Sequence, residues 1–257
     1  MDRATDYDGR QIVGMDLHRH RSVLVRMTES GERLGRARFD NSPAALTEEI
    51  SKAGANPRVV VEATYGWYWA ADALVAAGAE VHLAHPLGVK MFTYRRVKTD
   101  ERDAADLADL LRMGRLPEAW IAPPVTRELR ELARYRHKLV SLRTSAKDQG
   151  HAVLAKAGLR IPVTDLYGTT GRIWLRDQDL PEVYRLRLES ILRVLDTLMD
   201  EIGRLDAELH RRLAGDRRYQ ALRTIPGVAL FSPPSCSPRS ATSRAFPAPA
   251  SCAPGRA

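Results

Sequence analysis

Short apolar runs separated by turn residues fill the first third of the chain. Apolar and β-branched residues dominate residues 11–18 and 22–27, and a Glu-Ser-Gly-Glu turn separates the second run from residues 33–39, in which Leu34, Ala37 and Phe39 are apolar. Runs of this length between turns predict a meander of three strands. Continuous apolar runs at residues 58–63 and 80–84 are typical of buried strands in a parallel sheet.

Helical patterns lie between and after these strands. Ser42 followed by Pro43 predicts a helix start, with the serine as N-cap and the proline in the first turn. Further helices are expected over residues 66–77 and 99–112, the latter with Thr99 as its N-cap. Three strands followed by alternating helices and strands predict an α/β domain with a mixed sheet.

Two long helical segments, residues 126–154 and 180–213, follow and are joined by a linker at 158–171. The second segment has apolar residues at alternating steps of three and four, namely Leu188, Ile191, Leu195, Leu198, Ile202, Leu205 and Leu209. Such a heptad seam predicts packing along another helix, as in an antiparallel helical hairpin or coiled coil. A seam of this kind favours a structural role, and its partner is either the first long helix or a second subunit of a homo-oligomer.

Composition narrows the function classes. The chain has 257 residues, 44% of them hydrophobic, and a net charge of +8. It has no apolar run long enough for a membrane span and no apolar core near its start, so we expect a cytoplasmic protein without membrane contact. With Cys236 and Cys252 as the only cysteines, a disulfide framework or a cysteine-based zinc site is excluded. The basic excess favours a nucleic-acid partner.

The last 29 residues, 229–257, differ from the rest. They contain six of the 15 prolines, six serines, both cysteines and no acidic residue. A segment of this composition forms no regular helix or strand, so we expect a disordered tail.

Four carboxylates stand where buried elements begin or end. Asp16 interrupts an apolar strand, Glu62 ends another, and Asp100 and Asp103 open a helix and share one face of it. Clustered carboxylates repel one another and attract divalent cations, and Mg²⁺ or Mn²⁺ prefers oxygen ligands. The pattern predicts a catalytic site with two metal ions that acts on a phosphodiester. Asp106 is a reserve candidate for the place of Asp103.

Each acid also has a plainer interpretation. Asp16 or Glu62 alone could pair with an arginine, and Asp100 and Asp103 alone could be charges favoured by the helix dipole. The joint pattern is more specific than any one member. His18 and His20 flank Asp16, and a His-Arg-His turn is more often solvated or phosphate-facing than metal-binding.

Basic residues suggest where a nucleic acid binds. Residues 127–147 carry a net charge of +5, and a one-sided excess over a long helix favours a phosphate backbone. A second basic cluster precedes Asp100. The candidate nucleic-acid-binding residues are Arg95, Arg96, Lys98, Arg127, Arg130, Arg134, Arg136, Lys138, Arg143 and Lys147. Aromatic residues after Glu62, including Tyr65 and Trp69, either stack on unpaired bases or pack a helix onto the sheet.

Five motifs in order carry a family resemblance over residues 10–228. They are VGMDLH, VVVEATYGWYW, VKTDERDAADLADLL, ELRELARYRHKLVSLRT and LRTIPGV. The chain resembles the DEDD transposases of the bacterial insertion-sequence family one-hundred-and-ten. By motif match, Asp16, Glu62, Asp100 and Asp103 take the family's four metal-binding and catalytic places.

The resemblance implies an organisation and a set of partners. Residues 10–115 would form a RuvC-like, ribonuclease H-like domain, 125–215 a coiled-coil region, and 216–228 the start of a C-terminal transposase domain. It further implies metal-dependent DNA cleavage and strand transfer, an RNA encoded by the element as guide, and action on the bacterial nucleoid.

After Val228 the match stops. One nucleotide string can encode residues 229–257 and, shifted by one base, a peptide with helical apolar spacing that resembles the family's next segment. A truncation by frameshift is therefore our hypothesis, and sequencing the gene across this point tests it. No serine of the tail stands in the context of the family's nucleophile, so none is assigned, and we expect a chain that cannot complete recombination alone.

Three alternatives remain open. A non-catalytic nucleic-acid-binding remnant would keep the fold without the chemistry. A RuvC-like junction nuclease would use the same metals, although the long helices disfavour it. Sugar kinases and actin-like ATPases share a similar first strand, but they need glycine-rich phosphate loops, and the sequence has no GxGxxG or GxxxxGK motif.

Overall fold

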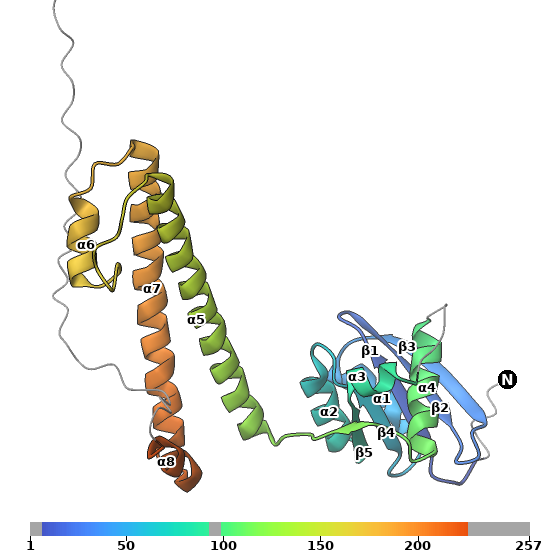
Figure 1. Ribbon diagram of the computed structural model, residues 1–257. Coiled ribbons are helices and arrows are strands. Elements are labelled where there is room, and N and C mark those ends of the chain that lie inside the picture. The colour runs from blue at the N-terminus through green and yellow to red at the C-terminus, as the bar shows by residue number, and fades with distance from the viewer. Residues whose placement is uncertain (1–6, 93–98, 226–257) are drawn as a thin grey trace, which may run out of the picture. The chain divides into compact units, whose positions relative to one another are not determined.

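The computed structural model describes residues 7–92 and 99–225, and the chain divides into two compact units between Ala122 and Pro123 (Figure 1). The tail at residues 229–257 lies outside the described residues. The first unit contains β1 (Ile12–Leu17), β2 (Arg21–Met27), β3 (Arg33–Asp40), α1 (Pro43–Ser51), β4 (Arg58–Glu62), α2 (Trp67–Ala76), β5 (Glu80–Ala84), α3 (Pro86–Lys90), α4 (Asp100–Arg112) and β6 (Glu118–Ala119).

The strands of this unit form a six-stranded mixed sheet in the order β3-β2-β1-β4-β5-β6. Antiparallel pairing joins β1 to β2 and β2 to β3, whereas β1–β4 and β4–β5 are parallel. The predicted meander and α/β sheet are thus confirmed, and the arrangement is consistent with a ribonuclease H-like fold. The sequence did not predict α3 or β6, because elements this short carry no measurable periodicity.

The two faces of the sheet carry different helices. Val13 and Met15 pack in one core cluster with Leu46 of α1 and Leu74 of α2. The alternate position Ile12 packs in another cluster, with Val60 of β4 and with residues of α4 such as Leu107. Because side chains alternate along a strand, every second residue of β1 and β4 faces α4.

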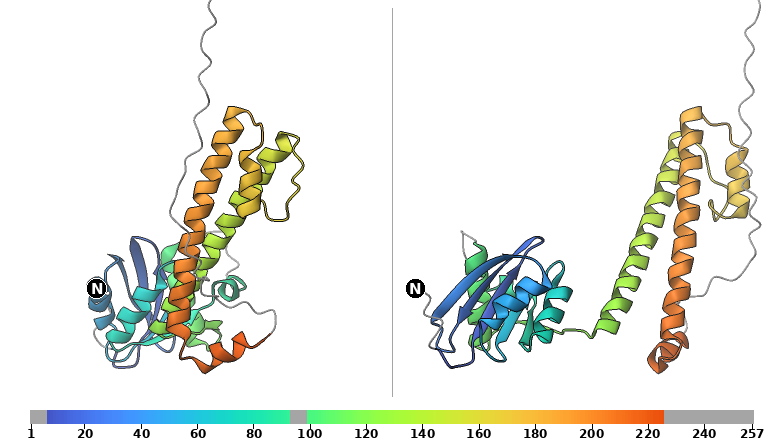
Figure 2. Two further views of the ribbon diagram at one scale, coloured as in Figure 1. Left: turned by 90° about the vertical axis from the view of Figure 1, so that its left-hand side faces the viewer. Right: turned by 180° about the vertical axis from the view of Figure 1, so that it is seen from behind.

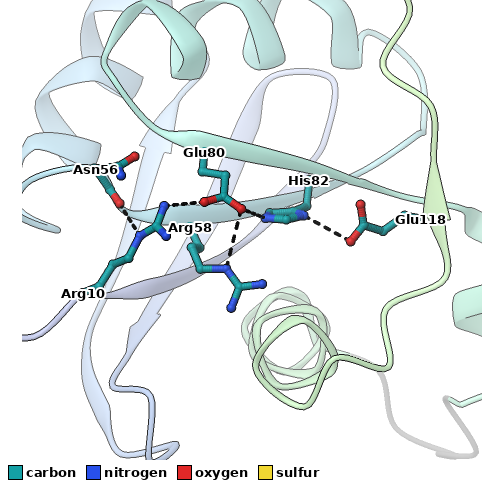
Figure 3. A network of polar contacts seen from close by, with 6 residues as sticks. All are labelled: Arg10, Asn56, Arg58, Glu80, His82 and Glu118. Carbon is teal, nitrogen blue, oxygen red and sulfur yellow. Dashed lines mark hydrogen bonds and ion pairs between the residues drawn. The ribbon is translucent and has the colours of Figure 1, made fainter.

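A network of ion pairs crosses the sheet where β4 and β5 begin (Figure 3). Arg10 donates to Glu80 at 2.5 Å and lowers the pKa of that carboxyl. His82 lies between two carboxylates, 2.9 Å from Glu80 and 3.1 Å from Glu118. Since Glu118 belongs to β6, this network fastens the last strand and the chain leading out of the unit to β5.

The second unit is helical, with α5 (Pro124–Lys156), α6 (Thr169–Arg176), α7 (Glu182–Leu213) and α8 (Arg217–Arg223). Helices α5 and α7 lie side by side and run antiparallel (Figure 2). Near the start of α5 and the end of α7, Arg136 donates to Asp206 and Arg212 donates to Glu128. The predicted linker at 158–171 overlaps α6, whose eight residues are too few for a clear helical pattern.

The apolar seam of α7 packs against α5 of the same chain. Leu188, Ile191 and Leu195 are buried and share a core cluster with Val153 and Leu154 of α5. The partner of the seam is therefore at least in part the first long helix. No helix in the described part of the chain is both long enough and apolar enough to cross a membrane.

Removing the carboxylate of Asp206 is expected to destabilise the second unit by about 2 kcal/mol. Its side chain is 12% exposed and binds Arg136 through two hydrogen bonds, 2.7 and 3.3 Å long. Losing a partly buried, charged pair of this kind costs about 1.5–3 kcal/mol. Denaturant unfolding of Asp206→Ala, followed by helical circular dichroism, measures the loss.

Glu201→Ala is the matched control, because Glu201 binds Arg204 on the solvent face of the same helix. An exposed pair of this spacing contributes about 0.3–0.5 kcal/mol. Equal effects of the two substitutions would contradict a stabilising role for the pair between α5 and α7.

Candidate metal centre

Asp16 and Glu62 lie at the carboxyl ends of neighbouring parallel strands. Met15 of β1 is in register with Val61 of β4, so the next residues along the two strands, Asp16 and Glu62, are neighbours at this edge. Both belong to the alternate set of positions that faces α4. Two carboxylates from different strands therefore meet on one face at one edge of the sheet.

Helix α4 brings two more carboxylates to this edge. The hydroxyl of Thr99 accepts a hydrogen bond from the Arg102 amide, so the helix begins at Asp100, as the sequence predicts. Gly14 of β1 lets the helix approach closely, because a Cβ atom there would stand 1.8 Å from the carbonyl oxygen of Ala104. The first turn of α4, with Asp100 and Asp103, is thereby held next to the end of β1.

Asp16, His18 and Asp100 form a compact group. Nε2 of His18 is 3.0 Å from Oδ2 of Asp16 and 3.4 Å from Oδ1 of Asp100, and one possible ligand atom from each residue lies within 4.8 Å of the others. The Asp16 side chain is 14% exposed, whereas those of His18 and Asp100 are about half exposed. The group therefore has one member that is mostly covered, Asp16, and an open side.

The electrostatics of Asp16 favour a cation. Burial raises the pKa of its carboxyl, and the charges of Asp103 and Asp100 raise it further, against a lowering by His18. A buried carboxylate beside two further acids is costly when ionised without a positive partner. Asp103 acts on Asp16 in this way, whereas Asp106 is one turn further along the helix.

His18 is a residue that sequence reasoning underrated. The His-Arg-His segment suggested a solvated turn, but the ring of His18 reaches both Asp16 and Asp100. Its position two residues after Asp16 was the available signal, because such residues share a face in extended chain. Glu62 is half-buried at the same edge and lies outside the compact group of three.

The aromatic residues after Glu62 divide into two kinds. Trp67 and Trp69 pack against the core cluster that contains α1 and α2, which agrees with the packing interpretation. Tyr65 is 86% exposed, directly before Gly66, whose backbone takes a left-handed conformation with φ of 82° at the start of α2. Only Tyr65 of these three is presented to solvent.

The candidate nucleic-acid-binding residues of α5 occupy different environments. Arg127 is 4% exposed and Arg136 is paired with Asp206, so neither guanidinium is freely presented on the predicted binding surface. The ammonium group of Lys147 lies 5.5 Å from the centre of the Tyr167 ring. The others are exposed or half-buried, namely Arg130, Arg134, Lys138 and Arg143. Arg95, Arg96 and Lys98 lie outside the described residues.

The first unit is thus a mixed α/β domain with an acidic group at the carboxyl edge of its central strands. The family model of the IS110-type DEDD transposases, described as "Transposase", matches residues 13–158. This match covers more than half of the chain and includes Asp16, Glu62, Asp100 and Asp103. The chain belongs to this transposase family.

Individual relatives agree with the family. The transposase of insertion sequence element IS1328 from Yersinia enterocolitica is 27% identical over 229 residues, which cover 86% of this chain and 65% of the relative. A family 20 transposase of Pseudomonas aeruginosa is 25% identical over 70% of this chain and 54% of its own length. The chain thus spans slightly under two thirds and about half of these two relatives.

One solved structure, the ethanolamine utilization protein EutJ from Carboxydothermus hydrogenoformans, is 15% identical and covers 34% of this chain and 41% of its own. Its TM-score of 0.26 is too low to carry an argument.

Proposed function

We propose that this chain binds DNA and takes part in metal-dependent cleavage during transposition of an insertion sequence. The observation that carries the proposal is the group of Asp16, His18 and Asp100, with Asp103 and Glu62 beside it, in a member of a transposase family. We propose a ribonuclease H-like fold for the first unit and a place of action in the bacterial cytoplasm, on nucleoid DNA.

The residues fit divalent ions of the hard type. Asp16, Glu62, Asp100 and Asp103 would hold Mg²⁺ or Mn²⁺, in our proposal two ions, since carboxylate oxygens suit both metals. When bound, such ions stabilise charge on the phosphodiester oxygens and activate the attacking oxygen. The raised pKa of Asp16 supports this assignment, because burial and the neighbouring Asp103 and Asp100 all disfavour its ionised form, which a bound cation would favour.

The protein's own side chains would bind and orient the nucleic acid. On α5, Arg130, Arg134, Lys138 and Arg143 are accessible and remain our proposal for backbone contacts. We further propose an element-encoded RNA as a partner and association of copies through a coiled coil that includes α7. The antiparallel contact between α5 and α7 supports a rigid helical arm.

We also propose that cleavage and strand transfer separate in this chain. The motif match ends near Val228, and no serine of residues 229–257 stands in the context of the family's nucleophile. A purified chain of this sequence would therefore nick DNA but would not join it to a target. The second candidate is a chain that binds nucleic acid without cutting it.

The test uses the full chain, Mg²⁺, duplex DNA with the element's ends, and the element's RNA. We expect nicked strands that require Mg²⁺ and disappear with a chelator, and no joined product. Joined product would refute the separation of cleavage from strand transfer. Binding without nicking in Mg²⁺ and in Mn²⁺ would establish the second candidate instead.

A further inference from the structure

Strand β3 places an arginine in the same cross-strand row as Asp16. Asp16 of β1 is in register with Val23 of β2, and Val23 is in register with Arg38 of β3. Val23 packs against Ala104 and Ala105 of α4, so this row faces the same side of the sheet as α4. With neighbouring strands about 4.8 Å apart, the backbone of Arg38 is about 10 Å from that of Asp16.

Arg38 differs from the other arginines of its strand. Arg33 and Arg36 are both paired with Glu101 of α4, and the Arg33 distance is 3.5 Å. Arg38 is exposed, and within residues 7–92 and 99–225 its side chain has no hydrogen bond or ion pair. Arg38, which lies in the row of Asp16, is therefore the arginine of β3 whose guanidinium is available to bind a ligand.

The turn between β1 and β2 adds a second such arginine. Arg19 is exposed, lies at the carboxyl end of β1, and likewise has no polar contact in the described part of the chain. Asn41 holds the turn in place. Its side-chain Nδ2 donates to the His18 carbonyl at 2.6 Å, and its backbone N–H donates to the His20 carbonyl at 2.9 Å. Arg21 also belongs to this surface, but its cross-strand neighbour is the acidic residue Asp40.

We propose that Arg38 and Arg19 form a phosphate-binding surface for the DNA strand that enters the acidic site. The inference rests on the proposed function and names residues outside the basic clusters that the sequence suggested. A carboxylate group repels the phosphates on either side of a cut, so nearby positive charge is needed to hold them. Guanidinium groups suit phosphate because they donate two parallel hydrogen bonds.

Fluorescence anisotropy tests this surface with a labelled 30-base-pair duplex and single-stranded DNA and RNA of the same sequence, with a chelator present to prevent cutting. Arg38→Ala is compared with Arg36→Ala, which removes the same charge two residues away. For the duplex we expect Arg38→Ala to flatten the slope of log K against log salt by about 0.9, and the double variant with Arg19→Ala by about 1.8. At 0.1 M salt the double variant should bind the duplex about tenfold more weakly or worse.

Each result decides one question. Equal slopes for Arg38→Ala and Arg36→Ala would refute the phosphate-binding surface. An effect confined to the RNA probe would refute its assignment to DNA. A wild-type chain that binds none of the probes would refute the proposed function itself. Thermal unfolding at wild-type temperature confirms that the exposed substitutions leave the fold intact.

Discussion

Asp16→Asn should lose metal-dependent cleavage and, without metal, unfold at a higher temperature than the wild type. Mutating a residue that hydrogen-bonds to a metal ligand lowers metal affinity or activity about 10–100-fold. Loss of a ligand itself should have a larger effect, so we expect the nicking rate to fall more than about 100-fold. The gain in stability follows from the raised pKa of Asp16. A carboxyl whose pKa is raised by folding destabilises the folded state once it is ionised.

The stability difference between the wild type and Asp16→Asn should depend on pH. Below the ordinary carboxyl pKa, Asp16 is protonated in both folded and unfolded chains and costs nothing. As pH rises through the ordinary value and then through the raised folded-state value, the unfolded chain gives up the proton first, and the wild type loses stability relative to Asp16→Asn. The stability difference between the two proteins should therefore be largest at neutral pH and vanish in acid.

Bound Mg²⁺ should reverse this difference and make the wild type more stable than Asp16→Asn. At about 100 times its dissociation constant, Mg²⁺ stabilises a protein by about 2.7 kcal/mol, and only the wild type should show this gain. Thermal unfolding in chelator and in Mg²⁺ measures both effects. Asp106→Asn is the control, since Asp106 lies one turn beyond Asp103 and should leave the Mg²⁺ response intact. A full Mg²⁺ response in Asp16→Asn would show that the metal centre is assigned to the wrong residues.

Gly14→Ala should disrupt the contact between β1 and α4 and with it the site. The added Cβ would stand 1.8 Å from the Ala104 carbonyl oxygen and 2.8 Å from the Ala108 amide nitrogen. Both atoms are backbone, so no side chain can turn away and the helix itself must move. Overpacking of a core usually costs about 1–3 kcal/mol, and we expect at least the upper end here.

The effect on function should exceed the effect on stability. A shifted α4 carries Asp100 and Asp103 away from Asp16, so the Mg²⁺-induced rise in unfolding temperature should be lost even where the variant still folds. Gly215→Ala is the control, because nothing lies within 4 Å of a Cβ at that position. Wild-type stability and Mg²⁺ response in Gly14→Ala would show that the close approach of α4 is unnecessary.

Local sequence pattern was sufficient to predict most helices and strands and to name four candidate acids. Apolar runs and turns located the strands β1 to β5, and Thr99 marked the first residue of α4. An acid inside or at the end of a buried strand is visible in sequence because its neighbours are apolar. The short elements α3, α6 and β6 were not predicted, because a periodic pattern can be recognised only over more residues than they have.

Side chains whose surroundings come from distant segments could not be placed in this way. The positive charge of α5 was evident, but the burial of Arg127 and the pairing of Arg136 with Asp206 depend on how α5 packs within the fold. Likewise, the row that joins Asp16 to Arg38 exists only through strand register. Register and helix contacts join residues that are remote in sequence, and no single segment encodes them.

The sequence by itself therefore determined the family, the mixed α/β domain and which four carboxylates are the candidates for the site. Only the tertiary structure decided which groups accompany them: His18 between Asp16 and Asp100, and the arginines of β3 beside the site. The physical reasons are the close approach of α4 to β1 at Gly14 and the register of β1, β2 and β3, which are contacts between backbones that composition and periodicity do not reveal.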